Sequence, residues 1–229
     1  MRGVFVTGTD TEVGKSVVAA AICAALAARG ERVAAFKPVV TGLDEEPGEY
    51  GHDHELLARV AGAGHPPSEV APYSFGPPVS PHLAAELAGV TIEPRKLVEK
   101  ARAAAAGAAS TDGDGALVCE GVGGLMVPIT PGYLVRDLAV DLGLPVVIVA
   151  RPGLGTINHT LLTVEAARAA GLRVAGIVMT PWPDEPSAME RSNRETVERL
   201  SGVEVSGLAP TSPNALAPAG ATLPVDDWL

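Results

Sequence analysis

A lysine and a serine close a glycine-bounded loop near the amino terminus, in the stretch Gly8-Thr9-Asp10-Thr11-Glu12-Val13-Gly14-Lys15-Ser16. The apolar run Val4-Phe5-Val6 precedes this loop, and a long alanine-rich segment follows it. A strand, a glycine-bounded loop, a Lys-Ser pair and a helix together predict a phosphate-binding loop. The loop amides and the helix amino terminus favour an anion, the Lys15 ammonium can contact outer phosphates, and the Ser16 hydroxyl can ligate Mg2+.

The spacing of this loop differs from the common form. In the G-x-x-x-x-G-K-[ST] pattern, the first glycine falls at the position that Thr9 occupies here, whereas this chain places its glycine at Gly8. We therefore expect a loop with one additional residue, or a loop of a special subclass.

Two further charged side chains follow apolar segments that read as strands. Lys37 ends residues 32–37 and precedes Pro38-Val39-Val40-Thr41-Gly42, and Glu120 follows Ala116-Leu117-Val118-Cys119. A second lysine beside a phosphate loop can meet a transferring phosphoryl group or an anionic substrate, although a solvated lysine is the alternative. A carboxylate at Glu120 is typical of an Mg2+ ligand. A helix cap or a salt-bridge partner is the alternative, and the glycines after Glu120 favour the ligand.

Other polar residues lie at expected helix starts. Asp53 belongs to Gly51-His52-Asp53-His54-Glu55 and is by itself a better candidate for an N-cap than for a metal ligand. The two histidines suggest zinc only weakly, because they lie close together on a loop without a supporting cysteine. Ser80-Pro81-His82 and Asn158-His159 read as caps, while free amides at Thr156-Ile157-Asn158 can also hold a carboxylate.

Strands and helices alternate along the chain and must position these residues. The expected strands are 3–7, 32–37, 115–119, 145–150, 173–179 and 203–208, and the expected helices are 15–29, 53–61, 82–88, 94–107, 134–142, 156–170 and 187–200. Residues 64–81 read as irregular, and the tail 209–229 shows little periodicity. Continuous apolar strands predict an α/β, P-loop NTPase-like fold, with a mostly parallel, doubly wound sheet flanked by helices on both faces. We expect one domain over residues 1–229, with the strand ends and their polar groups at one edge.

Composition limits the partners. The formal net charge of −10 disfavours nucleic acid and anionic membrane surfaces. Cys23 and Cys119 lie in apolar segments, which indicates buried thiols in a reducing compartment. The first residues lead directly into a strand, and no apolar run is long enough to span a bilayer. We therefore expect a cytoplasmic protein without a signal peptide or membrane anchor.

Several motifs together resemble the dethiobiotin synthetase family of biotin biosynthesis. They occur in family order over roughly residues 4–180: the loop 8–16, Lys37-Pro38-Val39 with Thr41-Gly42, Pro72-Tyr73-Ser74-Phe75 with Ser80-Pro81-His82, Glu120-Gly121-Val122-Gly123-Gly124, and Leu154-Gly155-Thr156-Ile157-Asn158-His159. The phosphate loop is the most specific of them, since the longer loop is the form found in the family.

The resemblance implies a reaction. The diamine 7,8-diaminopelargonic acid (7,8-diaminononanoate), CO2 or bicarbonate, and ATP would give dethiobiotin, ADP and phosphate with Mg2+. One amine captures CO2 as a carbamate, a carbamate oxygen attacks the γ-phosphate to give a carbamic-phosphoric anhydride, and the second amine closes the ureido ring. Phosphoryl transfer of this kind depends mainly on positioning and positive charge.

The resemblance also assigns site residues. The catalytic group would be Lys37, Lys15 and Thr11. The phosphates would be wrapped by Glu12, Val13, Gly14, Lys15, Ser16 and Val17, and Mg2+ would be held by Ser16, Asp53 and Glu120. Gly121, Val122 and Gly123 would complete the nucleotide side, with the Gly121 and Gly123 amides near the carbamate. The diamine would be contacted by Thr41, which replaces a frequent serine, by Ser80, and by Gly155, Thr156, Ile157 and Asn158. The last four would bind its carboxylate across a homodimer interface.

The expected base subsite departs from the family pattern. Some members read adenine with an Asn-Asp pair, but this chain has Thr180-Pro181-Trp182-Pro183 there, and the later segment near Pro210 and Thr211 aligns loosely. We therefore expect ATP as co-substrate and leave other nucleoside triphosphates open.

Three alternatives remain. A cobyrinate-type amidoligase usually needs a glutaminase domain, for which 229 residues leave little room. A partitioning-type ATPase switch has a second lysine early in the loop, where this chain has Thr9. A nucleotide-binding regulatory domain would leave Lys37 without a role.

Overall fold

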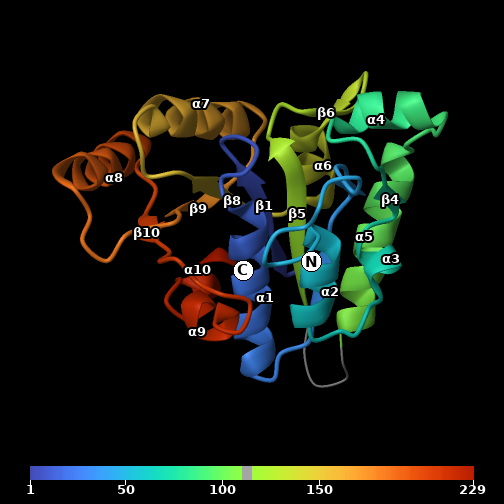
Figure 1. Cartoon of the computed structure of the whole chain (residues 1–229), viewed down its shortest axis with the longest axis horizontal. Coiled ribbons are helices and arrows are strands. Elements are labelled where there is room, and N and C mark those ends of the chain that lie inside the picture. The colour runs from blue at the N-terminus through green and yellow to red at the C-terminus, as the bar shows by residue number, and fades with distance from the viewer. Residues whose placement is uncertain (110–114) are drawn as a thin grey trace.

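The computed structural model describes residues 1–109 and 115–229, and a six-stranded parallel sheet runs through its centre (Figure 1). The strand order is β10-β9-β8-β1-β5-β2. These strands are β1 (Gly3–Gly8), β2 (Val33–Phe36), β5 (Ala116–Gly124), β8 (Val146–Ala150), β9 (Val174–Met179) and β10 (Val205–Gly207). Two short pairs lie outside this sheet: β3 (Val39–Val40) with β4 (Tyr73–Ser74), and β6 (Pro128–Thr130) with β7 (Tyr133–Leu134). The predicted α/β fold with a mostly parallel sheet is confirmed.

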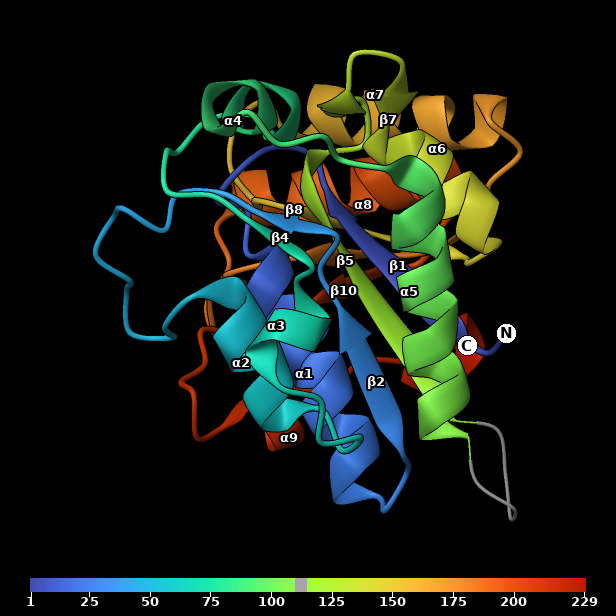
Figure 2. The same cartoon turned by 90° about the vertical axis from the view of Figure 1, so that its right-hand side faces the viewer.

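Helices cover both faces of the sheet. One face carries α1 (Lys15–Ala28), α2 (Asp53–Val60), α3 (Pro67–Val70), α9 (Leu216–Gly220) and α10 (Val225–Trp228). The other carries α4 (Pro81–Ala88), α5 (Pro94–Ala108), α6 (Val135–Leu142), α7 (Thr156–Ala169) and α8 (Ala188–Ser201). Figure 2 shows α5 on the opposite side of β2 and β5 from α1 and α2.

Strand alternation divides the core into two layers. Phe5 and Cys119 belong to one buried cluster, whereas their strand neighbours Val4, Val6 and Val118 belong to the other. Successive side chains of a strand point to opposite faces, so continuous apolar strands supply both layers. Within the described residues, no helix combines the length and the apolarity that a bilayer crossing requires.

The carboxyl-terminal segment is more ordered than its sequence predicts. The tail lacks periodicity, yet α9 and α10 lie there and pack on the α1 side of the sheet (Figure 1). A Cβ atom at Gly220 would overlap the backbone carbonyl of Ala21, and one at Gly176 would lie 2.5 Å from Nε1 of Trp228. Close packing against α1 and β9, rather than helix periodicity, therefore stabilises this segment.

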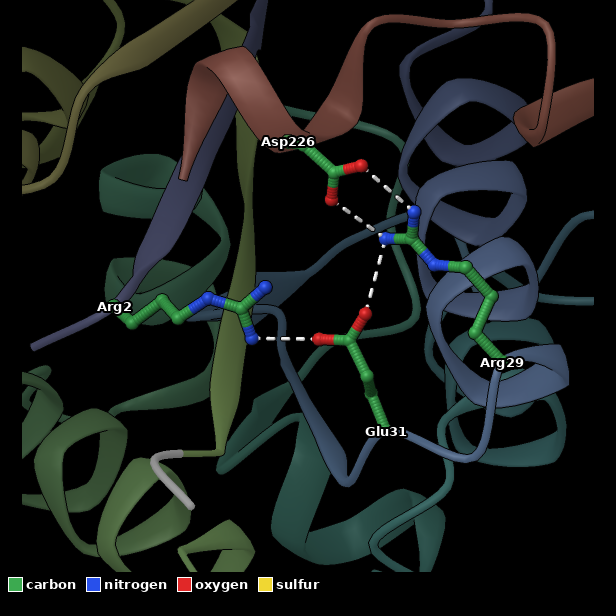
Figure 3. A network of polar contacts seen from close by, with 4 residues as sticks. All are labelled: Arg2, Arg29, Glu31 and Asp226. Atoms are coloured by element: carbon green, nitrogen blue, oxygen red, sulfur yellow. Dashed lines mark hydrogen bonds and ion pairs between the residues drawn. The ribbon is translucent and has the colours of Figure 1, made fainter.

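An ion-pair network connects the same segment to the carboxyl-terminal end of α1 (Figure 3). The Arg29 guanidinium donates two hydrogen bonds of 2.9 Å to the carboxylate of Asp226 and lies 3.0 Å from Glu31. Glu31 in turn accepts a 2.6 Å hydrogen bond from Arg2. These four side chains connect residues from both ends of the chain.

Two other expectations need correction. The strand predicted over 115–119 extends to Gly124, because β5 continues to pair with β1 as far as the Gly8–Gly124 position. Residues 64–81, expected to be irregular, contain α3 and β4.

Candidate functional site

The glycine-bounded loop joins β1 to α1 and folds around its own polar groups. The Lys15 ammonium donates a 2.7 Å hydrogen bond to the backbone carbonyl of Asp10, whose carboxylate accepts one of 2.7 Å from the Thr11 amide. Glu12 is the one described non-glycine residue in the left-handed region, with φ 56°. A left-handed residue within a loop can turn successive backbone amides toward one side, and such amides form an anion-binding concavity.

Gly14 ends the loop under a steric constraint. Its φ is 93°, and a Cβ atom there would lie 2.7 Å from Cγ2 of Thr180. Thr180, predicted at the base subsite, is buried against the loop and offers no side-chain amide. A residue larger than glycine would displace either Thr180 or the start of α1.

Four polar side chains from separate elements meet beside the loop. Lys37 Nζ lies 2.5 Å from Oε1 of Glu120 and 2.8 Å from Oδ2 of Asp53. The hydroxyl of Ser16 donates a 2.8 Å hydrogen bond to the same Oε1 of Glu120. Lys37 and Glu120 are buried, at 3% and 0% exposure, so their charges interact with little solvent screening.

The protonation of this cluster follows from burial and charge. Burial disfavours the Lys37 ammonium, but Asp53 and Glu120 outweigh that effect and raise the pKa of Lys37 above its usual range. Burial likewise opposes ionisation of Asp53, yet the neighbouring Lys37 lowers the pKa of Asp53 to about 2. Burial raises the pKa of Glu120. Burial is also the main reason why the pKa of Lys15 is lowered to about 8, and the nearby charge of Lys37 lowers it further.

The donor set of this cluster suits Mg2+. Glu120 Oε2 is buried and has no hydrogen-bond partner among the residues that the structure describes, so one carboxylate oxygen is available to a ligand. Carboxylate and hydroxyl oxygens are the donors that Mg2+ prefers, with one or two protein carboxylates and substrate phosphates completing its shell. The residues Ser16, Asp53 and Glu120 therefore fit a magnesium ion.

The neighbouring histidines offer no comparable set. The rings of His52 and His54 lie 6.2 Å apart, and burial lowers the pKa of His54. In the part of the chain that the structure describes, no three His, Cys, Asp or Glu residues gather in a position to hold a metal ion.

A cavity of about 690 Å³ opens over the phosphate loop and this cluster. Its volume lies within the roughly 300–1,000 Å³ that is usual for small-molecule sites. The predicted site residues that line it are Thr11, Glu12, Gly14, Lys15, Ser16, Val17, Lys37, Thr41, Asp53, Ser80, Val122 and Gly123. Ser80 precedes α4 without a side-chain cap bond and instead contacts Nδ1 of His82 at 3.0 Å.

Other predicted residues lie outside this cavity. Val13, Glu120 and Gly121 are buried and do not line it, and Thr180 lies against Gly14. The remaining residues of the predicted set that do not line it are Pro181, Pro210, Thr211, Gly155, Thr156, Ile157 and Asn158. The last four form the start of α7, where Asn158 is exposed.

The start of α7 adjoins a second cavity instead. This cavity has a volume of about 520 Å³, and its lining includes Thr11, Met126, His159 and Leu162. Thr11 thus borders both cavities. Leu154 and Leu162 are 93% and 60% exposed, which leaves an apolar surface beside the start of α7.

Sequence reasoning missed three residues near the loop. Tyr50 lines the larger cavity and its hydroxyl donates a hydrogen bond to the backbone carbonyl of Thr211, a contact between two loops that no sequence pattern indicates. Asn193 holds the turn that follows β8. Arg151 contacts the backbone of the phosphate loop. Arg151 follows an apolar strand, the same signal that identified Lys37.

Comparisons with known proteins agree with this architecture. A family model described as an AAA domain matches residues 2–219. The ATP-dependent dethiobiotin synthetase BioD of Anaeromyxobacter dehalogenans (strain 2CP-1 / ATCC BAA-258) is 44% identical over 214 residues, covering 93% of this chain and 92% of that protein. The protein of the same name from Bacillus subtilis (strain 168) is 36% identical over 214 residues, which cover 93% of this chain and 89% of that protein.

A solved structure supports the fold alone. The MinC:MinD cell division protein complex of Aquifex aeolicus matches with a TM-score of 0.55 and 15% identity, over 98% of this chain and 87% of that chain. At this identity, the likeness extends to the arrangement of helices and strands.

Proposed function

The chain belongs to the ATP-dependent dethiobiotin synthetase family, and from this premise we propose how its residues carry out the reaction. The substrates are 7,8-diaminopelargonic acid, CO2 or bicarbonate, and ATP, and the products are dethiobiotin, ADP and phosphate. The observation that carries the proposal is the meeting of Lys37 with Asp53 and the buried Glu120 beside the phosphate loop, where Lys37 and Asp53 line one cavity.

Lys37 acts between carbamate and nucleotide. Its raised pKa keeps it cationic at neutral pH, so it can pair with the carbamate and with the γ-phosphoryl oxygens. Lys15 and Thr11 border the same cavity and position the phosphates. Preorganised charge of this kind stabilises a phosphoryl-transfer transition state without covalent chemistry.

Ser16, Asp53 and Glu120 hold Mg2+, which neutralises phosphate charge when bound. The unpartnered Oε2 of Glu120 supports this role, because a buried carboxylate oxygen otherwise lacks a compensating contact.

Ring closure depends on the conformation of the substrate. The second amine attacks the carbonyl carbon of the carbamic-phosphoric anhydride, and phosphate leaves as the ureido ring forms. Holding the chain of the diamine so that these atoms meet can contribute up to roughly 7–11 kcal/mol of the barrier. Thr41 and Ser80 line the same cavity as Lys37 and contact the diamine in this proposal.

The working unit is a homodimer. The start of α7 supplies amides and Asn158 for the substrate carboxylate, but it lies outside the cavity that contains Lys37. Leu154, directly before this start, and Leu162 of α7 are exposed apolar side chains, and their exposure supports a contact of α7 with a second copy. Each diamine is then held between Lys37 of one subunit and α7 of the other.

The chain acts as one synthetase domain over residues 1–229, in the cytoplasm. One six-stranded sheet through the described residues supports the first statement. Two free, buried cysteines, Cys23 and Cys119, support the second, because reduced thiols are usual in that compartment.

A product assay tests the reaction. Purified protein is incubated with Mg2+, diaminopelargonate and bicarbonate, and with ATP, GTP or CTP in parallel, while dethiobiotin and phosphate are measured. We expect both products only when diamine and bicarbonate are present together. Release of phosphate without diamine, and without a ureido product, would contradict the synthetase. The comparison of triphosphates tests the base subsite, where Thr180 provides no amide pair.

Mixing two impaired variants tests the shared pocket, with activity measured at a diamine concentration well below the KM of Asn158→Ala. Lys37→Ala and Asn158→Ala are mixed after unfolding, refolded together and assayed. In a symmetric dimer with shared sites, about a quarter of the sites recover both native residues. If Lys37 and Asn158 serve the same site from one subunit, mixing restores nothing.

A further inference from the structure

Arg151 contacts the phosphate loop from the next strand of the sheet. It follows β8 directly, and its Nη2 atom lies 3.2 Å from the carbonyl oxygen of Glu12 and 3.4 Å from that of Thr11. Thr11 and Glu12 line the larger cavity, whereas Arg151 does not. The guanidinium therefore contacts the loop backbone from outside the cavity lining.

Holding these carbonyls fixes the direction of two amides. In a planar trans peptide, the C=O and the N–H of the unit point in opposite directions. The carbonyls of Thr11 and Glu12 belong to the same peptide units as the amides of Glu12 and Val13. Contact of Arg151 with these carbonyls therefore directs the two amides away from the guanidinium.

The conformation of Glu12 makes such support necessary. Its left-handed φ of 56° is unfavourable for a residue with a Cβ atom and persists only where neighbours hold it. Arg151 supplies two charged contacts to the peptide units around this residue.

Arg151 itself lies on a fixed turn. The buried side-chain amide of Asn193 donates hydrogen bonds of 2.9 and 3.2 Å to the carbonyls of Pro152 and Gly153. The amide of Thr180 bonds to the carbonyl of Ala150 at 3.0 Å. The turn that carries Arg151 is thus held from α8 and from the end of β9.

We propose that Arg151 is a positioning residue for the nucleotide, which orients the Glu12 and Val13 amides of the phosphate loop toward the phosphates. This role rests on the proposed function, since it assumes that nucleotide phosphates bind at this loop. It adds to the site a residue that touches the loop backbone and not the substrate.

Calorimetric binding of ADP tests the proposal. The variants are Arg151→Met, which removes the donors and keeps the stem, and Arg151→Lys, which keeps a charged donor. We expect Arg151→Met to weaken ADP binding about tenfold, the effect of losing one charge-assisted hydrogen bond. Arg151→Lys is expected to recover part of this loss, and the KM for diamine is expected to stay at the wild-type value.

Arg102→Ala is the matched control. This exposed arginine also donates to a backbone carbonyl, that of Asp141 at 2.8 Å, but far along the chain from the loop. It should bind ADP as wild type does. Hydrogen–deuterium exchange of ligand-free protein provides a second measurement, in which Arg151→Met should exchange faster at residues 9–14 and Arg102→Ala should not.

Different results would contradict the positioning role of Arg151 and the proposed function. Wild-type ADP affinity and unchanged loop exchange in Arg151→Met would overturn the role of Arg151. An equal loss of affinity for ADP and diamine would also overturn it, since it would mean a general distortion. If wild type and Lys15→Ala bind ADP equally, the phosphate loop itself is misassigned and the proposed function fails.

Discussion

Lys37 Nζ and Glu120 Oε1 lie 2.5 Å apart, although the two residues are 83 positions apart in the sequence. The cause is strand register: Phe36 of β2 is paired with Cys119 of β5, and Lys37 and Glu120 follow these two residues. Neighbouring parallel strands thus deliver an ammonium and a carboxylate to the same point, where both are buried.

Replacing Lys37 by alanine should abolish most turnover. The variant loses the charge proposed to stabilise the transferring phosphoryl group, so we expect kcat to fall by about 10² to 10³. Single-turnover formation of ADP with saturating diamine measures this effect. Lys100→Ala, which changes an exposed lysine of α5 outside the cavity lining, should turn over normally. A Lys37→Ala enzyme with near-normal kcat and intact folding would rule out the role.

Replacing Asn158 by alanine should separate the two substrates. Asn158 is exposed on the first turn of α7 and away from the phosphate loop, so its loss should not affect nucleotide phosphates. We expect the KM for diamine to rise by about tenfold or more, the effect of one lost hydrogen bond to a carboxylate, with the KM for ATP nearly constant. Steady-state kinetics with each substrate varied in turn measure the KM for diamine and the KM for ATP separately. Equal increases in both values would contradict the assignment to the carboxylate.

Gly220→Ala should destabilise the fold. The new methyl group would overlap the carbonyl of Ala21 in α1, and backbone adjustments of this kind cost about 1–3 kcal/mol of unfolding free energy. Urea unfolding followed by circular dichroism measures the loss. Gly132→Ala is the matched control, because no atom lies within 4 Å of a Cβ there. Equal stability of the two variants would show that α9 does not pack closely on α1.

The pairing of Arg29 with Asp226 should make stability depend on salt and on acid. Hydrogen bonds from Arg29 lower the pKa of Asp226, so this contribution is present above the ordinary pKa of 3.8 and is lost as the pH falls through the lower folded value. We expect Asp226→Asn to lower the melting temperature slightly at neutral pH and low salt. The difference from wild type should shrink in high salt and at acidic pH. A difference that persists under both conditions would indicate a packing effect instead.

Much of the site could be predicted from residues at strand ends. Lys37 and Glu120 were identified because apolar strands precede them, and parallel strands must end at one edge. This inference did not require the order of the strands. The 2.5 Å contact between Lys37 and Glu120, however, depends on the register of β2 against β5, which no periodicity in the sequence specifies.

Other features depended on tertiary contacts. The helices α9 and α10 are short and contain proline and glycine, so their stability comes from packing on α1 and β9 and not from their own pattern. The bond from Tyr50 to Thr211 joins two loops, and the Arg151 contacts are made to backbone carbonyls, which carry no residue-specific signal. Thr180, predicted at the base subsite, lies against Gly14, and this contact depends on how closely the end of β9 approaches the loop.

The close packing of α9 on α1 has a consequence for synthesis on the ribosome. The helix that follows the phosphate loop is synthesised early, yet its outer face is covered by residues 216–228, which are synthesised much later. A nascent chain that lacks these residues exposes the apolar side of α1 and holds Lys15 and Ser16 on an incompletely packed helix. We therefore expect the helix that carries Lys15 and Ser16 to reach its full packing only after residues 216–228 have left the ribosome.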